Sequence, residues 1–189
     1  MNWYNITNID TIDSPALLLY KDRIQQNINH AVEMIKDVSL LRPHVKTNKT
    51  AEVCAMMMEA GITKFKCATI AEAEMLAMLK AKDVLLAYQP VGPKAKRLLA
   101  LVQQYPQTTF GCVTDNIDTA KALSDLFSSN NKTINAFIDL NTVVAAEYEQ
   151  LGAKKVDALF ADKHTHTSKA GAELNAGFVA AELKPLLGL

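Results

Sequence analysis

The segment with the clearest chemical potential places a lysine at the end of a predicted strand. Residues 40–46 are largely apolar, as in a buried β-strand, and Lys46 is the last of them. At the carboxyl end of a strand in a parallel sheet, we expect Lys46 to be partly withdrawn from water. Loss of hydration favours the neutral amine, which is a nucleophile towards an aldehyde. Most strand-end lysines are solvated surface charges, however, and we interpret Lys49 as one of these.

Two further basic side chains share the face of this predicted strand that carries Lys46. His44 lies two residues before Lys46, and Arg42 lies two residues before His44, so the period of a strand places all three on one face. His44 is either a residue that lines a pocket beside the lysine or a histidine packed in the core. Arg42 is interpreted as a charge at the opposite rim of the sheet.

Alternating strands and helices are predicted up to about residue 141 and would position this lysine. Successive strand-like runs begin about 19 to 26 residues apart, which suits βα units on a parallel sheet. Both an open doubly wound sheet and a closed barrel fit this order. The first strand-to-helix junction, residues 18–22, contains no glycine, which argues against a dinucleotide-binding loop and favours the barrel. The six predicted strands are residues 15–20, 40–46, 64–70, 83–89, 108–115 and 134–141.

A barrel with six strands instead of eight would be incomplete and would leave open sheet edges. From about residue 142 the strand pattern ends, and two short helices, a polar loop and a last helix are predicted. The predicted fold class is therefore α/β, a partial parallel (β/α) barrel followed by a short helical tail. We expect two domains, residues 1–141 and residues 142–189.

Composition excludes several classes of partner. Lys+Arg and Asp+Glu number 20 each, so the chain lacks the basic excess of a protein that binds nucleic acid or an anionic membrane surface. The N-terminus lacks the features of a secretory signal. Cys54, Cys67 and Cys112 have no metal-binding or redox spacing and are interpreted as buried thiols. We therefore expect a cytoplasmic protein.

The lysine segment resembles that of a known family of enzymes. Residues 42–49 read Arg-Pro-His-Val-Lys-Thr-Asn-Lys, which is similar to the cofactor-lysine segment of the D-threonine aldolase and D-serine dehydratase family. This family shares its barrel type with alanine racemase. The resemblance covers about residues 8–141 and includes Asp-Ser-Pro-Ala-Leu at residues 13–17, Ala-Thr-Ile-Ala-Glu-Ala-Glu at residues 68–74 and Asp-Val-Leu-Leu-Ala-Tyr at residues 83–88. Asn48 departs from it, because family members often carry histidine there.

The resemblance implies a pyridoxal 5'-phosphate-dependent lyase that acts on small D-amino acids. It makes Lys46 the lysine that binds the cofactor covalently and moves the substrate's α-proton, with His44 beside the cofactor. Aldol cleavage, ammonia elimination and racemisation all stay open. The family's divalent metal would bind in a C-terminal half that has no counterpart here, so no metal ligand is assigned. A homodimer is also implied.

The tail, residues 147–185, resembles a different family, the C-terminal end of a rhamnogalacturonan-acetylesterase-type SGNH hydrolase. By that resemblance Asp162 and His166 would activate a serine, but the chain has no Gly-Asp-Ser segment to supply that nucleophile. The chain is therefore interpreted as a truncated or chimeric lyase. The alternatives are a non-catalytic fragment or fusion product and an acetylesterase remnant.

Overall fold

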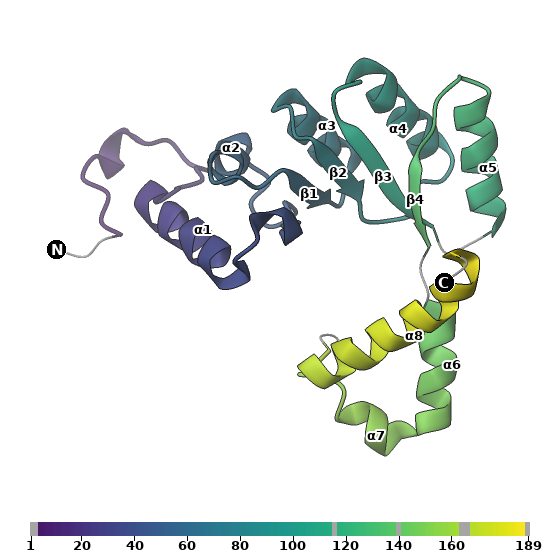
Figure 1. The fold of residues 1–189 in the computed structure, drawn as a ribbon. Coiled ribbons are helices and arrows are strands. Elements are labelled where there is room, and N and C mark those ends of the chain that lie inside the picture. The colour runs from purple at the N-terminus through teal and green to yellow at the C-terminus, as the bar shows by residue number, and fades with distance from the viewer. Residues whose placement is uncertain (1–3, 115–116, 139–140, 163–166, 188–189) are drawn as a thin grey trace.

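A four-stranded parallel sheet forms the centre of the protein (Figure 1). Its strands are β1 (Lys64–Cys67), β2 (Asp83–Leu86), β3 (Thr109–Thr114) and β4 (Asn135–Ile138), and they lie in sequence order. Every neighbouring pair is parallel. The computed structural model describes residues 4–114, 117–138, 141–162 and 167–187.

Helices alternate with these strands, as βα units require. They are α3 (Ile70–Met78), α4 (Pro93–Gln104) and α5 (Ile117–Ser128). The start of α3 follows from a side-chain cap, because Thr69 Oγ1 accepts a hydrogen bond from the Glu72 N–H at 3.1 Å. Pro93 lies in the first turn of α4, where its missing N–H leaves no helical bond unmade. The predicted α/β class with a parallel sheet is confirmed.

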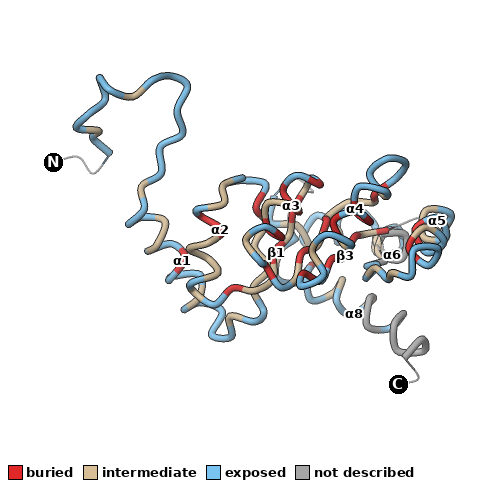
Figure 2. The backbone as a smooth tube through the Cα atoms, turned by 90° about the horizontal axis from the view of Figure 1, so that it is seen from above, coloured by how far each residue is buried: buried red, intermediate tan, exposed pale blue. Residues whose placement is uncertain are grey.

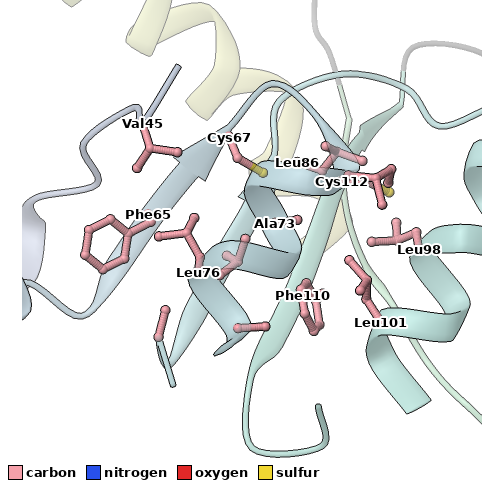
Figure 3. Packing of buried hydrophobic residues seen from close by; sticks show 14 of the residues in the cluster. Val45, Phe65, Cys67, Ala73, Leu76, Leu86, Leu98, Leu101, Phe110 and Cys112 are labelled. Atoms are coloured by element: carbon pink, nitrogen blue, oxygen red, sulfur yellow. The ribbon is translucent and has the colours of Figure 1, made fainter. Parts of the chain in front are cut away.

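The core lies between the sheet and these helices. Alternate residues of β1 and β2 are buried, so Phe65 and Cys67 of β1 lie in the core while Lys64 and Lys66 are only half-buried. Figure 3 shows Leu76 and Leu98 from the helices packed among strand residues. Burial of each large side chain contributes about 1.5–3 kcal/mol. Cys54, Cys67 and Cys112 are all buried free thiols, as predicted.

The first predicted strand is not part of the sheet. Residues 15–20 have no strand assignment, and Leu17 at their centre is 70% exposed. Figure 2 shows this segment extending away from the rest of the chain before α1 (Lys21–Ile35). A strand exists only where a partner accepts its hydrogen bonds, and local apolar pattern does not supply that partner. The prediction of a strand here is wrong.

The second predicted strand is reduced to one parallel bridge between His44 and Lys66 of β1. A short 3₁₀ helix (Val38–Leu40) replaces its start, and a turn follows His44 before α2 (Ala51–Glu59). Pro43 has no N–H to donate to β1, so the pairing does not extend towards residue 42 as a regular strand ladder would. The sheet therefore has four strands instead of the predicted six, and it is open, as expected.

Three helices follow the sheet: α6 (Asn141–Leu151), α7 (Ala153–Asp157) and α8 (Lys169–Leu187). They lie together to one side of the sheet (Figure 1). Tyr148 of α6 donates its hydroxyl to Asn175 Oδ1 of α8 at 2.9 Å, and its ring meets Phe160 edge-on with centroids 6.0 Å apart. The predicted helical tail agrees with this arrangement. Among the described helices, none combines the length and apolarity that crossing a membrane demands.

Candidate functional site

Lys46 lies in a tight turn that directly follows the bridge to β1. Val45 N donates to Lys66 O at 2.9 Å, and Lys66 N donates to Pro43 O at 2.9 Å, which together form the parallel bridge. Val45 is fully buried and anchors the turn in the core. Because Lys66 is followed by the last residue of β1, Lys46 lies at the carboxyl end of the sheet. This is the end at which open α/β sheets and barrels bind their ligands.

The Lys46 side chain is exposed, contrary to the expectation that it is partly withdrawn from water. The strand that was expected to end at Lys46 is reduced to one bridge, and the predicted first strand, residues 15–20, is not part of the sheet. The amine therefore projects from a fixed backbone position into solvent. Its place at the end of the sheet agrees with the prediction, and its role in binding a cofactor stays a prediction.

His44 lies beside Lys46 and is half-buried, so it is not among the fully buried residues of the core. Its Nδ1 accepts a hydrogen bond from the Lys46 N–H at 3.3 Å. Burial lowers the pKa of His44, and the charges of Lys66 and Lys46 lower it further, while Glu72 opposes them. The imidazole is therefore neutral at neutral pH, and an Nδ1 that accepts leaves the proton on Nε2.

Arg42 points away from this end of the sheet. Its guanidinium donates to both carboxylate oxygens of Asp83, at 2.6 and 2.8 Å. Asp83 is the first residue of β2 and so marks the amino end of the sheet. The interpretation of Arg42 as a charge at the opposite rim is confirmed.

The side chain of Lys49 is 58% exposed, which agrees with the interpretation of a solvated surface charge. The sequence did not indicate its partner: the ammonium forms an ion pair with Glu72 of α3, whose side chain is 6% exposed. Glu72 also accepts a hydrogen bond from the Ala68 N–H at 2.8 Å. Glu72 follows the capping residue Thr69 by three positions, which places it beside the carboxyl end of β1, but residues 42–49 do not indicate that Lys49 meets it.

The residues present fit the reactive end of an aldehyde cofactor. Lys46 supplies a primary amine, and neutral His44 supplies a polar group beside it. Lys66 and Lys46 both lie close enough to lower the pKa of His44, so two cationic side chains are available here to attract an anionic ligand. Among the described residues, no three His, Cys, Asp or Glu side chains gather into a metal-binding group.

The two residues predicted from the esterase resemblance lie in the tail. Asp162 is exposed and follows α7, and His166 lies outside the described residues. The pairing of Asp162 with His166 is therefore not tested, and the esterase resemblance stays a prediction.

Comparison with protein families identifies a match to the alanine racemase N-terminal domain over residues 19–173. Enzymes of this fold family depend on pyridoxal phosphate. The matched range continues past residue 141, where we predicted a domain boundary. That boundary stays a prediction.

Curated and solved relatives agree with this match. The chain is 27% identical over 137 residues to D-threo-3-hydroxyaspartate dehydratase of Delftia sp. (strain HT23). The match covers 70% of this chain and 34% of that relative. D-threonine aldolase from Filomicrobium marinum is 27% identical, with a TM-score of 0.61, and the match covers 69% of this chain and 35% of that one. An alanine racemase-like protein from Idiomarina loihiensis is 29% identical, with a TM-score of 0.53, over 64% of this chain and 32% of that one.

The chain thus spans about a third of the length of the relatives that it matches. The match covers the parallel sheet, its helices and the lysine turn, and it extends over more than half of the chain. This protein belongs to the family of the alanine racemase N-terminal domain.

Proposed function

We propose that this chain is the cofactor-binding N-terminal part of a pyridoxal phosphate-dependent lyase acting on β-hydroxy-D-amino acids. The observation that carries the proposal is the position of Lys46, on a hydrogen-bonded turn at the carboxyl end of a parallel sheet of the alanine racemase type. The names of two relatives support the substrate class, because D-threonine and D-threo-3-hydroxyaspartate both carry a hydroxyl at the β-carbon.

When bound, the cofactor supplies an electron sink for negative charge at the substrate's Cα. Lys46 would hold the cofactor through its amine, and the same amine would accept or donate the proton at the substrate's Cα. The backbone bonds of the turn limit where this amine can lie, which is the contribution that positioning makes to catalysis.

His44 supports this chemistry through its protonation state. A neutral imidazole with Nε2–H offers a hydrogen-bond donor next to Lys46 without adding a third full positive charge. The lowered pKa keeps it neutral around pH 7. We therefore assign His44 to the cofactor pocket, where it orients the bound group.

Aldol cleavage and elimination begin with the same complex and differ in which bond breaks at the β-carbon. The relatives include one aldolase and one dehydratase at equal identity, so neither outcome is preferred. The divalent metal that we expect from the family resemblance would be held by residues beyond those matched here. A cytoplasmic homodimer is part of the same proposal.

The domain division is also a proposal. The contact between Tyr148 and Asn175 and the ring packing with Phe160 join the segments of the tail to each other, which supports a separate helical unit after residue 141. Two alternative interpretations, a fusion product and an esterase remnant, also concern the tail, residues 142–189.

An absorbance titration with pyridoxal phosphate tests the proposed function. The wild-type protein should develop the visible band of a lysine-bound aldehyde with saturable dependence on cofactor concentration. Lys46→Ala should lose this band. Lys121→Ala removes an exposed lysine from α5 and is the matched control, which should behave as the wild type does. Equal bands in the two variants would refute the proposal.

A further inference from the structure

Glu72 is a buried carboxylate for which the proposed chemistry has no use. The residue is 5% exposed, and it lies in the first turn of α3. One carboxylate oxygen accepts from the Lys49 ammonium and the other from the Ala68 N–H at 2.8 Å. A buried carboxylate is costly unless it is paired, so these two partners account for its presence.

Lys49 holds an unusual backbone conformation on the other side of this ion pair. Its φ angle is 51°, in the left-handed region that residues with a Cβ atom rarely adopt. Its N–H donates to Val45 O at 2.9 Å, which closes the turn around Lys46. Such a conformation persists only where the surroundings hold it in place.

We infer that Glu72 and Lys49 act as a clamp that fixes the turn of residues 45–49 against the start of α3 and so holds Lys46 in position. Both are positioning residues, since they reach the reacting atoms only through the turn. The contacts of Glu72 and Lys49 alone support the inference that they fix the turn. The inference that they do so to position Lys46 for catalysis rests on the proposed function.

The charge state of Glu72 keeps the clamp closed at neutral pH. Burial raises the pKa of Glu72, but the Lys49 ammonium and the Ala68 N–H together outweigh it and lower the pKa below its usual value. His44 beside the bridge also lowers the pKa of Glu72, and Glu72 in turn raises the pKa of Cys67 of β1. His44 is neutral and the thiol is protonated at this pH, so Lys49 is the charged partner that matters.

Amide hydrogen exchange tests the clamp without any cofactor. Exchange of the peptide spanning residues 45–50 is compared in wild type, Glu72→Gln, Lys49→Gly and Lys49→Arg, with a β3 peptide as internal reference for global unfolding. Glycine adopts the left-handed conformation freely, so Lys49→Gly removes the ion pair while it keeps the backbone geometry. Lys49→Arg keeps the charge.

Glu72→Gln and Lys49→Gly should exchange about tenfold faster in this peptide than wild type, with the β3 peptide unchanged. Lys49→Arg should stay near the wild-type rate. If Glu72→Gln fails to fold, Lys49→Gly alone decides the outcome. Unchanged exchange in the turn of Lys49→Gly would overturn the inference, whatever the protein binds.

The rate at which the visible band develops with pyridoxal phosphate then tests the purpose of the clamp. It should fall about tenfold in Lys49→Gly and recover in Lys49→Arg. Faster exchange with an unchanged rate of band formation would refute the positioning role while the proposed function stands. A band that does not depend on Lys46 would refute the proposed function. In that case the hydrogen-exchange rates would still show whether Glu72 and Lys49 hold the turn.

Discussion

The guanidinium of Arg42 reaches past β1 and binds both carboxylate oxygens of Asp83 on β2, at 2.6 and 2.8 Å. It also donates to Phe65 O of β1 at 3.5 Å. The segment that precedes the lysine turn is therefore attached to two strands at the amino end of the sheet. At the other end, the turn is held by Glu72. Two side-chain ion pairs, Arg42 with Asp83 and Lys49 with Glu72, therefore attach the chain on either side of Lys46, in addition to its backbone bridge to β1.

Removal of the Arg42–Asp83 pair should destabilise the protein. The two side chains are 24% and 33% exposed, so after discount for solvent screening we expect Arg42→Gln to lower the free energy of unfolding by about 1–2 kcal/mol. The cost comes from a half-buried Asp83 carboxylate left without its partner. Denaturant unfolding of Arg42→Gln, Asp83→Asn and the double variant measures the coupling. Strictly additive losses would contradict a direct interaction.

The three thiols should be unreactive in the folded protein. Burial raises the pKa of Cys67 to about 12 and those of Cys54 and Cys112 to about 11. At pH 8 roughly one thiol in a thousand, or fewer, is then a thiolate, the form that attacks disulfide reagents. Ellman's reagent should label none of the three at pH 8 and all three in guanidinium chloride. Rapid labelling of the native protein would show that this part of the core is open.

The contribution of Glu72 to stability should depend on pH in a defined direction. Its folded-state pKa is lowered, so its stabilisation is fully present above the unfolded pKa of about 4.3 and is lost as pH falls through the folded value. The difference in unfolding free energy between wild type and Glu72→Gln should be about 2 kcal/mol at pH 7 and should shrink below about pH 4. A difference that grows as pH falls would mean that the carboxylate is not ionised in the folded state.

Gly171 should be intolerant of a side chain. A Cβ atom built at Gly171 near the start of α8 would overlap the carbonyl oxygen of Leu159, a backbone atom that cannot move aside cheaply. Gly171→Ala should therefore displace α8 from the segment that follows α7, while Gly177→Ala, with open space around its Cβ position, is the matched control. In limited proteolysis of Gly171→Ala, the first cuts should fall in the tail, after residue 141, before the sheet is digested. Digestion of the sheet at the same rate as the tail would argue against a separate helical unit.

Local signals in the sequence were sufficient for much of the fold. Thr69 and Pro93 fix the starts of α3 and α4, and the strands β1 to β4 each lie within a predicted run. These features depend on residues close together in the chain, where capping and periodicity act. The buried thiols were predictable for the same reason, because each lies in an apolar segment.

Features that depend on distant residues were not predictable in this way. The run of residues 15–20 has a strand-like pattern, but a strand requires a partner, and Leu17 remains exposed without one. Lys49 and Glu72 are separated by 23 residues, and nothing in the lysine segment itself indicates that its second lysine is paired. The exposure of Lys46 follows from the same missing strand.

The most direct measurement is reduction with sodium borohydride after incubation with pyridoxal phosphate, followed by peptide mapping. Reduction converts the lysine–cofactor link into a stable bond, so the mass of each peptide reports where the cofactor was held. We expect the added mass on the peptide containing Lys46, and we expect it to disappear in Lys46→Ala. Cofactor spread evenly over exposed lysines such as Lys121, or absent from Lys46, would contradict it.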